Sequence, residues 1–259
     1  MEEALKVTLV QSHLYWENPI ANRDHFSEIL SSIKEETHLI VLPEMFTTGF
    51  TMNAESVAEE KNGPTFLWLQ TEAKKKHSAI TGSIVIKENG LYYNRLFFVF
   101  PDGSFKTYNK KHTFTLAGEH DVYTAGRNHT IIDYMGWKIC PLICYDLRFP
   151  VWARNAHDYD LLLYVANWPK KRVLAWDVLL KARAIENMSY TIGVNRIGLD
   201  DTGHEYLGHS AAYDVLGEHI STTSFEKPFV ETISLSKNHI QTNRKHLQFL
   251  NDRDEFTLA

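Results

Sequence analysis

The stretch Leu161-Leu162-Leu163-Tyr164-Val165-Ala166 is a continuous apolar run. Such a run is typical of a strand in a sheet that is covered on both faces, because both sets of alternating side chains are then buried. A second apolar run, Trp137–Ile143, precedes it, and an amphipathic segment with apolar residues at helical spacing follows it over 173–188. Two strands and a covering helix in this order predict an α/β protein with buried sheets and helices outside.

The same pattern continues toward both ends of the chain. Asn18 and Pro19 predict the start of a helix, with Asn18 as the N-cap and Pro19 at the first helical position. Asn89-Gly90 predicts the turn of a hairpin. After Leu235 the chain turns polar, so we expect a peripheral tail from about residue 236. We further predict strands over 6–11, 38–42, 78–86, 91–100, 190–194, 210–213 and 229–234, a helix over Pro64–Lys76, and a short helical segment after Phe149-Pro150.

Composition narrows the class of protein. The 259 residues carry a net charge of −5, which argues against a nucleic-acid-binding surface. Two cysteines are too few for a disulfide scaffold. The chain starts with acidic residues and no apolar signal segment, and its apolar runs are too short to span a membrane, so we expect a cytoplasmic protein without membrane contact. No linker or repeat divides the sequence, and we expect one domain over residues 1–259.

Three patterns place a reactive side chain just after an apolar run, which is where sites form in open α/β sheets. Glu44 is either a solvated loop carboxylate or a general base. Lys110 and Lys111 form either a solvated basic turn or a site in which one lysine stabilises an oxyanion. Cys140 lies inside a strand and fits a core residue, whereas Cys144 stands where the strand meets polar residues. A nearby lysine would favour the thiolate of Cys144.

Together these patterns resemble the nitrilase, or carbon–nitrogen hydrolase, superfamily, whose Glu–Lys–Cys triad has this chain order. The matching segments are Leu42-Pro43-Glu44, Tyr108-x-Lys110-x-His112 and Cys144-Tyr145-Asp146-x-Arg148-Phe149-Pro150. The second segment aligns the lysine of the family's triad with Lys110 and not with Lys111. Gly118-Glu119-His120 resembles the segment with a second active-site glutamate, and Ala166-Asn167-Trp168-Pro169 resembles the loop that lines the substrate pocket.

The resemblance implies a four-layer α-β-β-α sandwich, a homodimer and no cofactor. The chain is most similar to the omega-amidase branch, which hydrolyses the terminal amide of small acids such as 2-oxoglutaramate and succinamate. Glu44 would then transfer protons, Lys110 and the backbone N–H of Tyr145 would stabilise the oxyanion, and Cys144 would form a thioester. Glu119 would orient Lys110 or hold the amide.

An omega-amidase also needs a cation for the substrate carboxylate. Arg148, Lys170, Lys171 and Arg172 are the candidates near the expected pocket, which Tyr145, Asn167 and Trp168 would help to line. The ordinary alternative for Arg148 is an ion pair with Asp146 or a buried position in which it supports other residues of the site.

The sequence also bears on other possible functions. An aliphatic amidase, a carbamoyl-amino-acid hydrolase or a nitrilase would use the same triad on a different substrate. A zinc site is not expected, because the second histidine of the protease motif that begins at His204 would fall at Gly208. A nucleotide-binding module would need a glycine-rich phosphate loop, which the sequence lacks. A catalytically silent scaffold is disfavoured by the intact triad.

Overall fold

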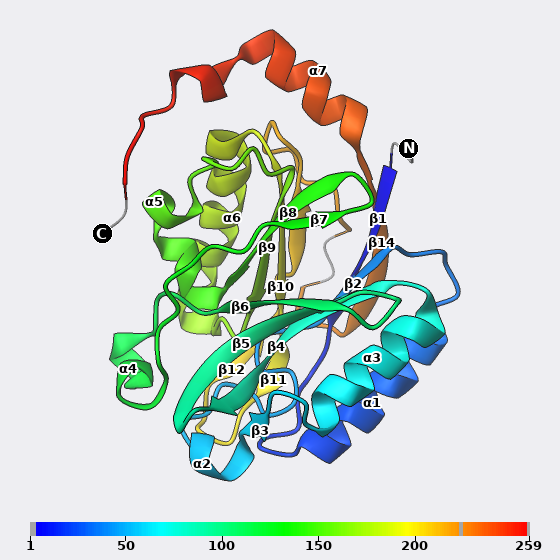
Figure 1. Ribbon diagram of the computed structural model, residues 1–259, viewed down its shortest axis with the longest axis vertical. Helices are drawn as coiled ribbons and strands as arrows, with labels where there is room; N and C mark the ends of the chain where they lie inside the picture. Colours follow the sequence, from blue (N-terminus) through cyan, green and yellow to red (C-terminus); the bar gives the residue numbers. More distant parts are fainter. Residues whose placement is uncertain (1–3, 223–224, 258–259) are drawn as a thin grey trace.

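Two large β-sheets lie face to face at the centre of the molecule, which a computed structural model describes over residues 4–222 and 225–257 (Figure 1). The first sheet has the order β14-β1-β2-β4-β5-β6, with β3 beside β4. Its strands are β1 (Ala4–Gln11), β2 (Leu39–Val41), β3 (Glu59–Glu60), β4 (Ala79–Glu88), β5 (Leu91–Val99), β6 (Phe105–Asn109) and β14 (Phe229–Ser236). The second has the order β13-β10-β9-β8-β7. Its strands are β7 (Ile132–Tyr134), β8 (Trp137–Ile143), β9 (Leu161–Ala166), β10 (Tyr190–Asn195) and β13 (Ala211–Tyr213).

The alternation of side chains along the central strands separates the core into layers. In β2, Leu39 and Val41 point into the space between the sheets, while Ile40 packs with the helices on the other face. In β9 every residue is buried, because one face meets the first sheet and the other is covered by helix. The apolar run 161–166 is therefore a strand buried on both faces, as predicted.

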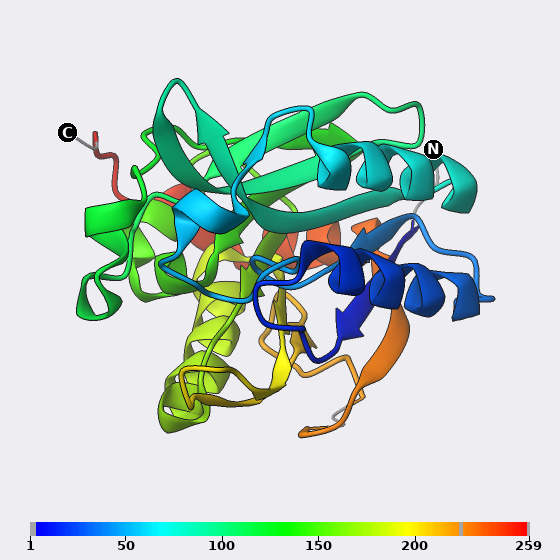
Figure 2. The ribbon, with the colours of Figure 1, turned by 90° about the horizontal axis from the view of Figure 1, so that it is seen from below.

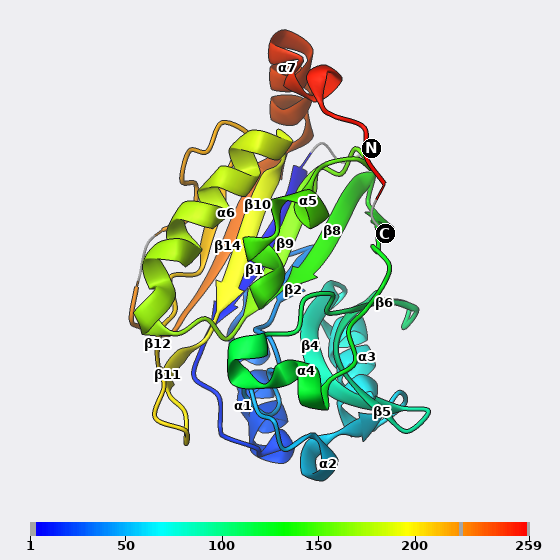
Figure 3. The ribbon, with the colours of Figure 1, turned by 90° about the vertical axis from the view of Figure 1, so that its left-hand side faces the viewer.

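Helices cover the outer faces of both sheets. Helices α1 (Pro19–Ser32) and α3 (Pro64–Lys76) lie side by side on the first sheet (Figures 1 and 2). Helices α6 (Val173–Asn187) and α5 (Pro150–Ala153) cover the second (Figure 3). This arrangement is the predicted four-layer α-β-β-α sandwich.

The contact between α6 and β10 depends on a glycine. A Cβ atom on Gly193 would lie 2.6 Å from atoms of both Leu180 and Trp176 on α6. Real Cβ atoms do not approach other atoms this closely, so only glycine lets the helix pack so near to the strand.

Local signals in the sequence account for several element ends. The Asn18 side chain accepts a hydrogen bond from the N–H of Ala21 and caps α1, with Pro19 at its first position. Asn89 and Gly90 both have positive φ, as a type I′ turn between β4 and β5 requires.

The C-terminal segment differs from the expected polar tail. Strand β14 continues to Ser236 and pairs with β1, and α7 (Lys237–Leu247) follows it. Ile240 is buried, and the Arg244 side chain donates to the backbone carbonyls of Met188 and Tyr159. The segment is therefore a packed helix, because one apolar side chain and one arginine attach an otherwise polar sequence to the second sheet.

The remaining short elements lie in connections or, for the last of them, after α7. They are α2 (Ala54–Val57), α4 (Glu119–Val122), the hairpin of β11 (Ile197–Leu199) and β12 (Glu205–Leu207), and the 3-10 turns η1 (Thr115–Ala117), η2 (Cys144–Arg148), η3 (Lys170–Arg172) and η4 (Phe249–Asp252).

Candidate active site

The predicted triad comes from both sheets. Glu44 follows the end of β2, and Lys110 directly follows β6, both in the first sheet. Cys144 directly follows β8 in the second sheet, and Asn167 directly follows β9. Glu119 is the first residue of α4. Because parallel strands end at the same edge of a sheet, the facing sheets bring the first four side chains to one place, and Glu119 reaches Lys110 from α4.

Lys110 lies between two buried carboxylates. Its Nζ atom is 3.0 Å from Glu44 Oε1 and 2.9 and 3.0 Å from the two oxygens of Glu119. Lys110 is 1% exposed, and both glutamates are fully buried. Burial alone would lower the pKa of Lys110, but the charges of Glu119 and Glu44 outweigh it and hold that pKa above its ordinary value. The lysine is therefore a fixed cation at neutral pH.

Glu44 is held by amide groups as well as by Lys110. Asn94 Nδ2 donates to Oε1 at 2.8 Å, and the backbone N–H of Asn167 donates to Oε2 at 2.7 Å. The Asn167 side chain also donates to the backbone carbonyl of Glu44. Sequence analysis missed Asn94, because it lies in the middle of β5 and no motif surrounds it.

Cys144 stands at a strained turn beside this group. Its φ of +45° is unusual for a residue other than glycine. The thiol donates to the carbonyl oxygen of Asn167 across 4.0 Å, and the Glu44 carboxylate lies close enough to raise the pKa of the thiol. The sharp turn at the end of β8 thus places the sulfur beside the Glu44 carboxylate.

The resting cysteine is a thiol. Burial raises the pKa of Cys144 well above its usual range, the Glu44 charge adds to this, and the Lys110 charge opposes it. The Lys110 charge does favour the thiolate, as expected, but burial and the carboxylates outweigh that one cation. Burial likewise raises the pKa of Glu119, although Lys110 opposes the shift. Cys140 is buried inside β8, as predicted.

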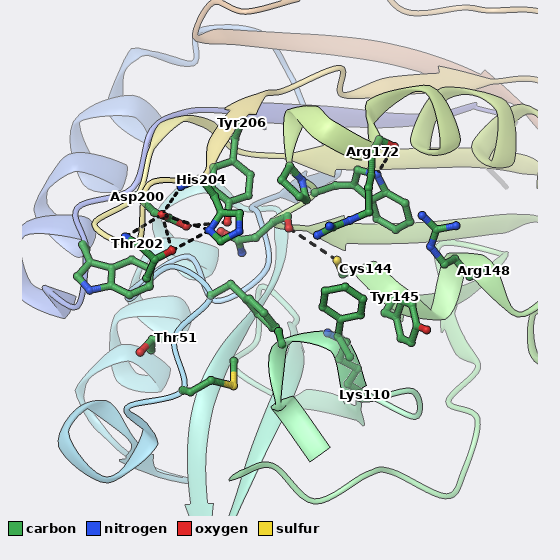
Figure 4. Close-up of a pocket in the computed structure, with 18 residues that line it drawn as sticks. Thr51, Lys110, Cys144, Tyr145, Arg148, Arg172, Asp200, Thr202, His204 and Tyr206 are labelled. Atoms are coloured by element: carbon green, nitrogen blue, oxygen red, sulfur yellow. Dashed lines mark hydrogen bonds and ion pairs between the residues drawn. The ribbon is translucent and has the colours of Figure 1, made fainter. Parts of the chain in front are cut away.

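A cavity of about 350 Å³ opens in front of Cys144 and Lys110 (Figure 4). Tyr145, Arg148, Asn167 and Trp168, all predicted from the sequence, line it. Glu44 and Glu119 lie behind Lys110, outside the lining. The wall that sequence analysis missed comprises Trp16, Phe50, Met52 and Phe114, together with Asp200, Thr202, His204 and Tyr206 at the β11–β12 hairpin.

Two of the candidate cations reach the cavity. The Arg148 guanidinium lies 5.0 Å from the centre of the Trp168 ring, and that of Arg172 lies 5.0 Å from the Phe114 ring. Neither arginine forms an ion pair with a carboxylate in the described part of the chain. Lys170 instead pairs with Glu205 on the surface.

The Arg148–Asp146 ion pair considered above does not form. The two oxygens of Asp146 accept hydrogen bonds from Tyr108, His112 and the backbone N–H of Ile143. The Arg148 side chain stacks on Trp168 instead.

Neither a metal site nor a membrane-spanning helix is found in the described residues. No group of three His, Cys, Asp or Glu side chains within 4–222 and 225–257 has an arrangement that could hold a metal ion. In the same ranges, no helix has both the length and the apolar character needed to cross a membrane.

Comparison with protein families assigns the molecule to a class. A model described as carbon-nitrogen hydrolase matches residues 6–244, which is most of the chain. The chain belongs to this family, as the sequence motifs predicted.

Individual relatives narrow the class further. The chain is 44% identical to omega-amidase YafV of Yersinia enterocolitica over 254 residues, which cover 98% of each chain. It is 35% identical to 2-oxoglutaramate amidase of Bacillus subtilis over 205 residues, or 76% of this chain and 78% of the relative. A crystal structure of XC1258 from Xanthomonas campestris, described as a CN-hydrolase superfamily protein with an arsenic adduct in the active site, matches with a TM-score of 0.96. Its sequence identity is 39%, and the match covers 99% of each chain. The protein is a hydrolase that acts on amides.

Proposed function

We propose that the enzyme hydrolyses the terminal amide of a small dicarboxylic acid monoamide, such as 2-oxoglutaramate or succinamate, to the acid and ammonia. The observation that carries the proposal is the pairing of a reactive centre with free cations. Cys144 lies beside Glu44 and Lys110, and the same cavity presents Arg148 and Arg172 without carboxylate partners in the described residues. The similarity to omega-amidases and to a 2-oxoglutaramate amidase supports this substrate class.

Glu44 activates the nucleophile in this proposal. The thiol of Cys144 is protonated at neutral pH, so a base must remove its proton before attack. The Glu44 carboxylate lies close enough to that thiol to raise its pKa, and we assign it the role of the base that takes the proton. The sulfur then bonds to the amide carbon, and the carbonyl oxygen becomes an oxyanion.

Lys110 stabilises the oxyanion. Its charge is fixed by Glu119 and Glu44, so it contributes a permanent cation in a site where little water screens it. We assign the second donor to the backbone N–H of Tyr145, at the start of η2. Both carboxylate oxygens of Glu119 accept hydrogen bonds from Lys110 Nζ, and we assign Glu119 the role of orienting the lysine.

Glu44 transfers the protons in both halves of the reaction. Glu44 returns its proton to the amide nitrogen, the C–N bond breaks and ammonia leaves, which gives a thioester on Cys144. Water then enters, gives a proton to Glu44 and attacks the thioester carbon. The C–S bond breaks, the acid is released, and the proton on Glu44 returns to the thiolate.

We assign the distal carboxylate of the substrate to Arg172. The Arg172 side chain extends toward the side of the cavity that holds Cys144, whereas the guanidinium of Arg148 turns away along Trp168 (Figure 4). A guanidinium binds a carboxylate through two parallel hydrogen bonds and so selects for it over an uncharged group.

We also propose that two copies associate through the outer face of α6. Leu174, Val178 and Ile185 are 74%, 56% and 46% exposed. Their spacing places them on one stripe of the helix, together with the exposed Lys181, and this stripe faces away from the second sheet. Pairing this stripe with its copy would give the expected homodimer.

The experiment is ammonia release by purified enzyme from 2-oxoglutaramate and succinamate, with glutamine, asparagine and a simple nitrile as comparison substrates. Cys144→Ala is the catalytic control, and Cys140→Ala is the matched control at the other cysteine. We expect release from the first two substrates by the wild type and by Cys140→Ala, and none by Cys144→Ala.

Two results would contradict the proposal in different ways. Release from glutamine, asparagine or the nitrile in preference to the acid amides would refute the substrate class and leave the mechanism standing. Release that persists in Cys144→Ala would refute the mechanism itself.

A further inference from the structure

Asp146 joins the two segments that carry Lys110 and Cys144. Its Oδ2 atom accepts from the Tyr108 hydroxyl at 2.7 Å and from the backbone N–H of Ile143 at 3.0 Å. Its Oδ1 atom lies 2.9 Å from the backbone nitrogen of His112 and 2.7 Å from Nδ1 of the same residue. One carboxylate thus binds residues on both sides of the gap between the sheets.

The positions of these partners are regular. Tyr108 and His112 lie two residues before and two residues after Lys110. Ile143 directly precedes Cys144, and Asp146 follows it by two residues. The hydrogen bonds therefore enclose the lysine and the cysteine from both sides along the chain, without contacting either side chain.

Packing makes this connection rigid. Asp146 is fully buried and Tyr108 is 1% exposed. The His112 ring stacks on Phe149 with its centre 3.6 Å away and an angle of 5° between the planes. Trp152 Nε1 donates to the Tyr108 hydroxyl at 3.0 Å, which fixes the direction in which that hydroxyl donates to Asp146. Hydrogen bonds that support each other in a buried network hold their groups more firmly than isolated ones.

We propose that Asp146, with Tyr108 and His112, is a positioning group that sets the separation of Lys110 from Cys144. This rests on the proposed function, in which the oxyanion forms between these two side chains. A change of about 1 Å in such a separation can cost roughly 10²-fold in rate. The group touches neither the substrate nor the reacting atoms, so it acts through the backbone on either side of them.

The test removes one partner of Asp146 at a time and leaves Asp146 in place, because replacing Asp146 would strand the four donors that it satisfies. Tyr108→Phe deletes the hydroxyl, and with it the acceptor for Trp152 Nε1 and for the backbone N–H of Lys111. Its matched control is Tyr159→Phe, since Tyr159 is equally buried and donates to the carbonyl of Ala153, away from the cavity.

His112→Phe deletes Nδ1 and keeps a ring against Phe149. Its matched control is His209→Phe, because His209 also stacks on a phenylalanine ring, that of Phe225, and bonds a carboxylate, Asp177, through Nδ1 away from the cavity. His112→Asn is the rescue variant, since its amide can donate in place of Nδ1.

Two readouts separate positioning from stability. The first is kcat and KM for succinamate, with thermal unfolding measured in parallel. The second is the pH profile of Cys144 alkylation by iodoacetamide. Lys110 lowers the pKa of that thiol, opposing burial and the charges of Glu44 and Glu119, so moving the lysine away shifts the profile to higher pH. Glu44 and Glu119 are unchanged in every variant.

We expect Tyr108→Phe and His112→Phe to lower kcat by about 10- to 100-fold with KM nearly unchanged. We also expect both to move the alkylation profile to higher pH, and His112→Asn to restore both quantities in part. If both variants match Tyr159→Phe and His209→Phe in kcat and in alkylation, the positioning role is refuted. A wild type inactive on all amides would refute the proposed function instead, and the alkylation profiles would still decide the positioning role.

Discussion

Replacing Arg172 by methionine removes the cation that we assign to the substrate carboxylate. Methionine keeps an unbranched side chain, so it can still lie over Phe114, where the guanidinium now packs. The backbone carbonyl of Arg172 still accepts from Trp168 Nε1 at 2.7 Å, which preserves that wall of the cavity. The triad is untouched, so the variant isolates recognition of the distal carboxylate.

The expected magnitude follows from the interaction lost. A hydrogen-bonded contact to a charged group contributes about 1.5–3 kcal/mol, which corresponds to about 10- to 150-fold in kcat/KM for succinamate. Arg148 remains in the same cavity and attracts the carboxylate over a longer distance, so we expect the lower half of this range. Butyramide has no carboxylate, and its kcat/KM should stay within about twofold of the wild-type value.

The assay is ammonia release at a series of concentrations of succinamate and of butyramide. Arg154→Met serves as the matched control, because Arg154 binds the carbonyl of Glu186 outside the cavity. The ratio of the two kcat/KM values should fall only in Arg172→Met. An unchanged ratio in that variant, with a loss in Arg148→Met, would refute the assignment and move the carboxylate to Arg148.

Glu119→Gln removes a charge that keeps Lys110 protonated and oriented, so kcat should fall about 10- to 100-fold at unchanged thermal stability; activity equal to wild type would contradict the orienting role. Gly193→Ala adds a Cβ 2.6 Å from α6 and should destabilise the fold by about 1–3 kcal/mol in urea unfolding. A urea midpoint at or above that of the wild type would show that the helix contact tolerates the added atom. Val178→Glu places a charge on the exposed stripe of α6 and should convert a dimer to a monomer in sedimentation velocity. If the wild type itself sediments as a monomer, the dimer proposal is wrong.

The parts of the site that the sequence predicts are those next to strand ends. Glu44 and Cys144 each follow a short apolar run, so their placement at the edge of a buried sheet is a local property. Asn94 is a site residue that such local reasoning does not identify. It is one of several buried residues in the middle of β5, and only the pairing of β5 with β4 and β6 brings it to Glu44.

The ionisation state of Cys144 could not be predicted from the sequence either. A lysine in the site favours a thiolate when considered alone, but the balance depends on burial and on two carboxylates from distant segments. The packing of the C-terminal helix α7 was not predicted for a similar reason. The polarity of 237–247 suggests a solvated tail, whereas Ile240 and Arg244 find partners only after the second sheet has formed.

The measurement that tests the account most directly is intact-protein mass spectrometry of enzyme quenched in acid during turnover of succinamate. The account predicts a succinyl adduct that maps to the peptide containing Cys144, disappears when the substrate is exhausted, and is absent from Cys144→Ala. An adduct on another residue, or steady ammonia release by Cys144→Ala, would contradict a thioester route through this cysteine.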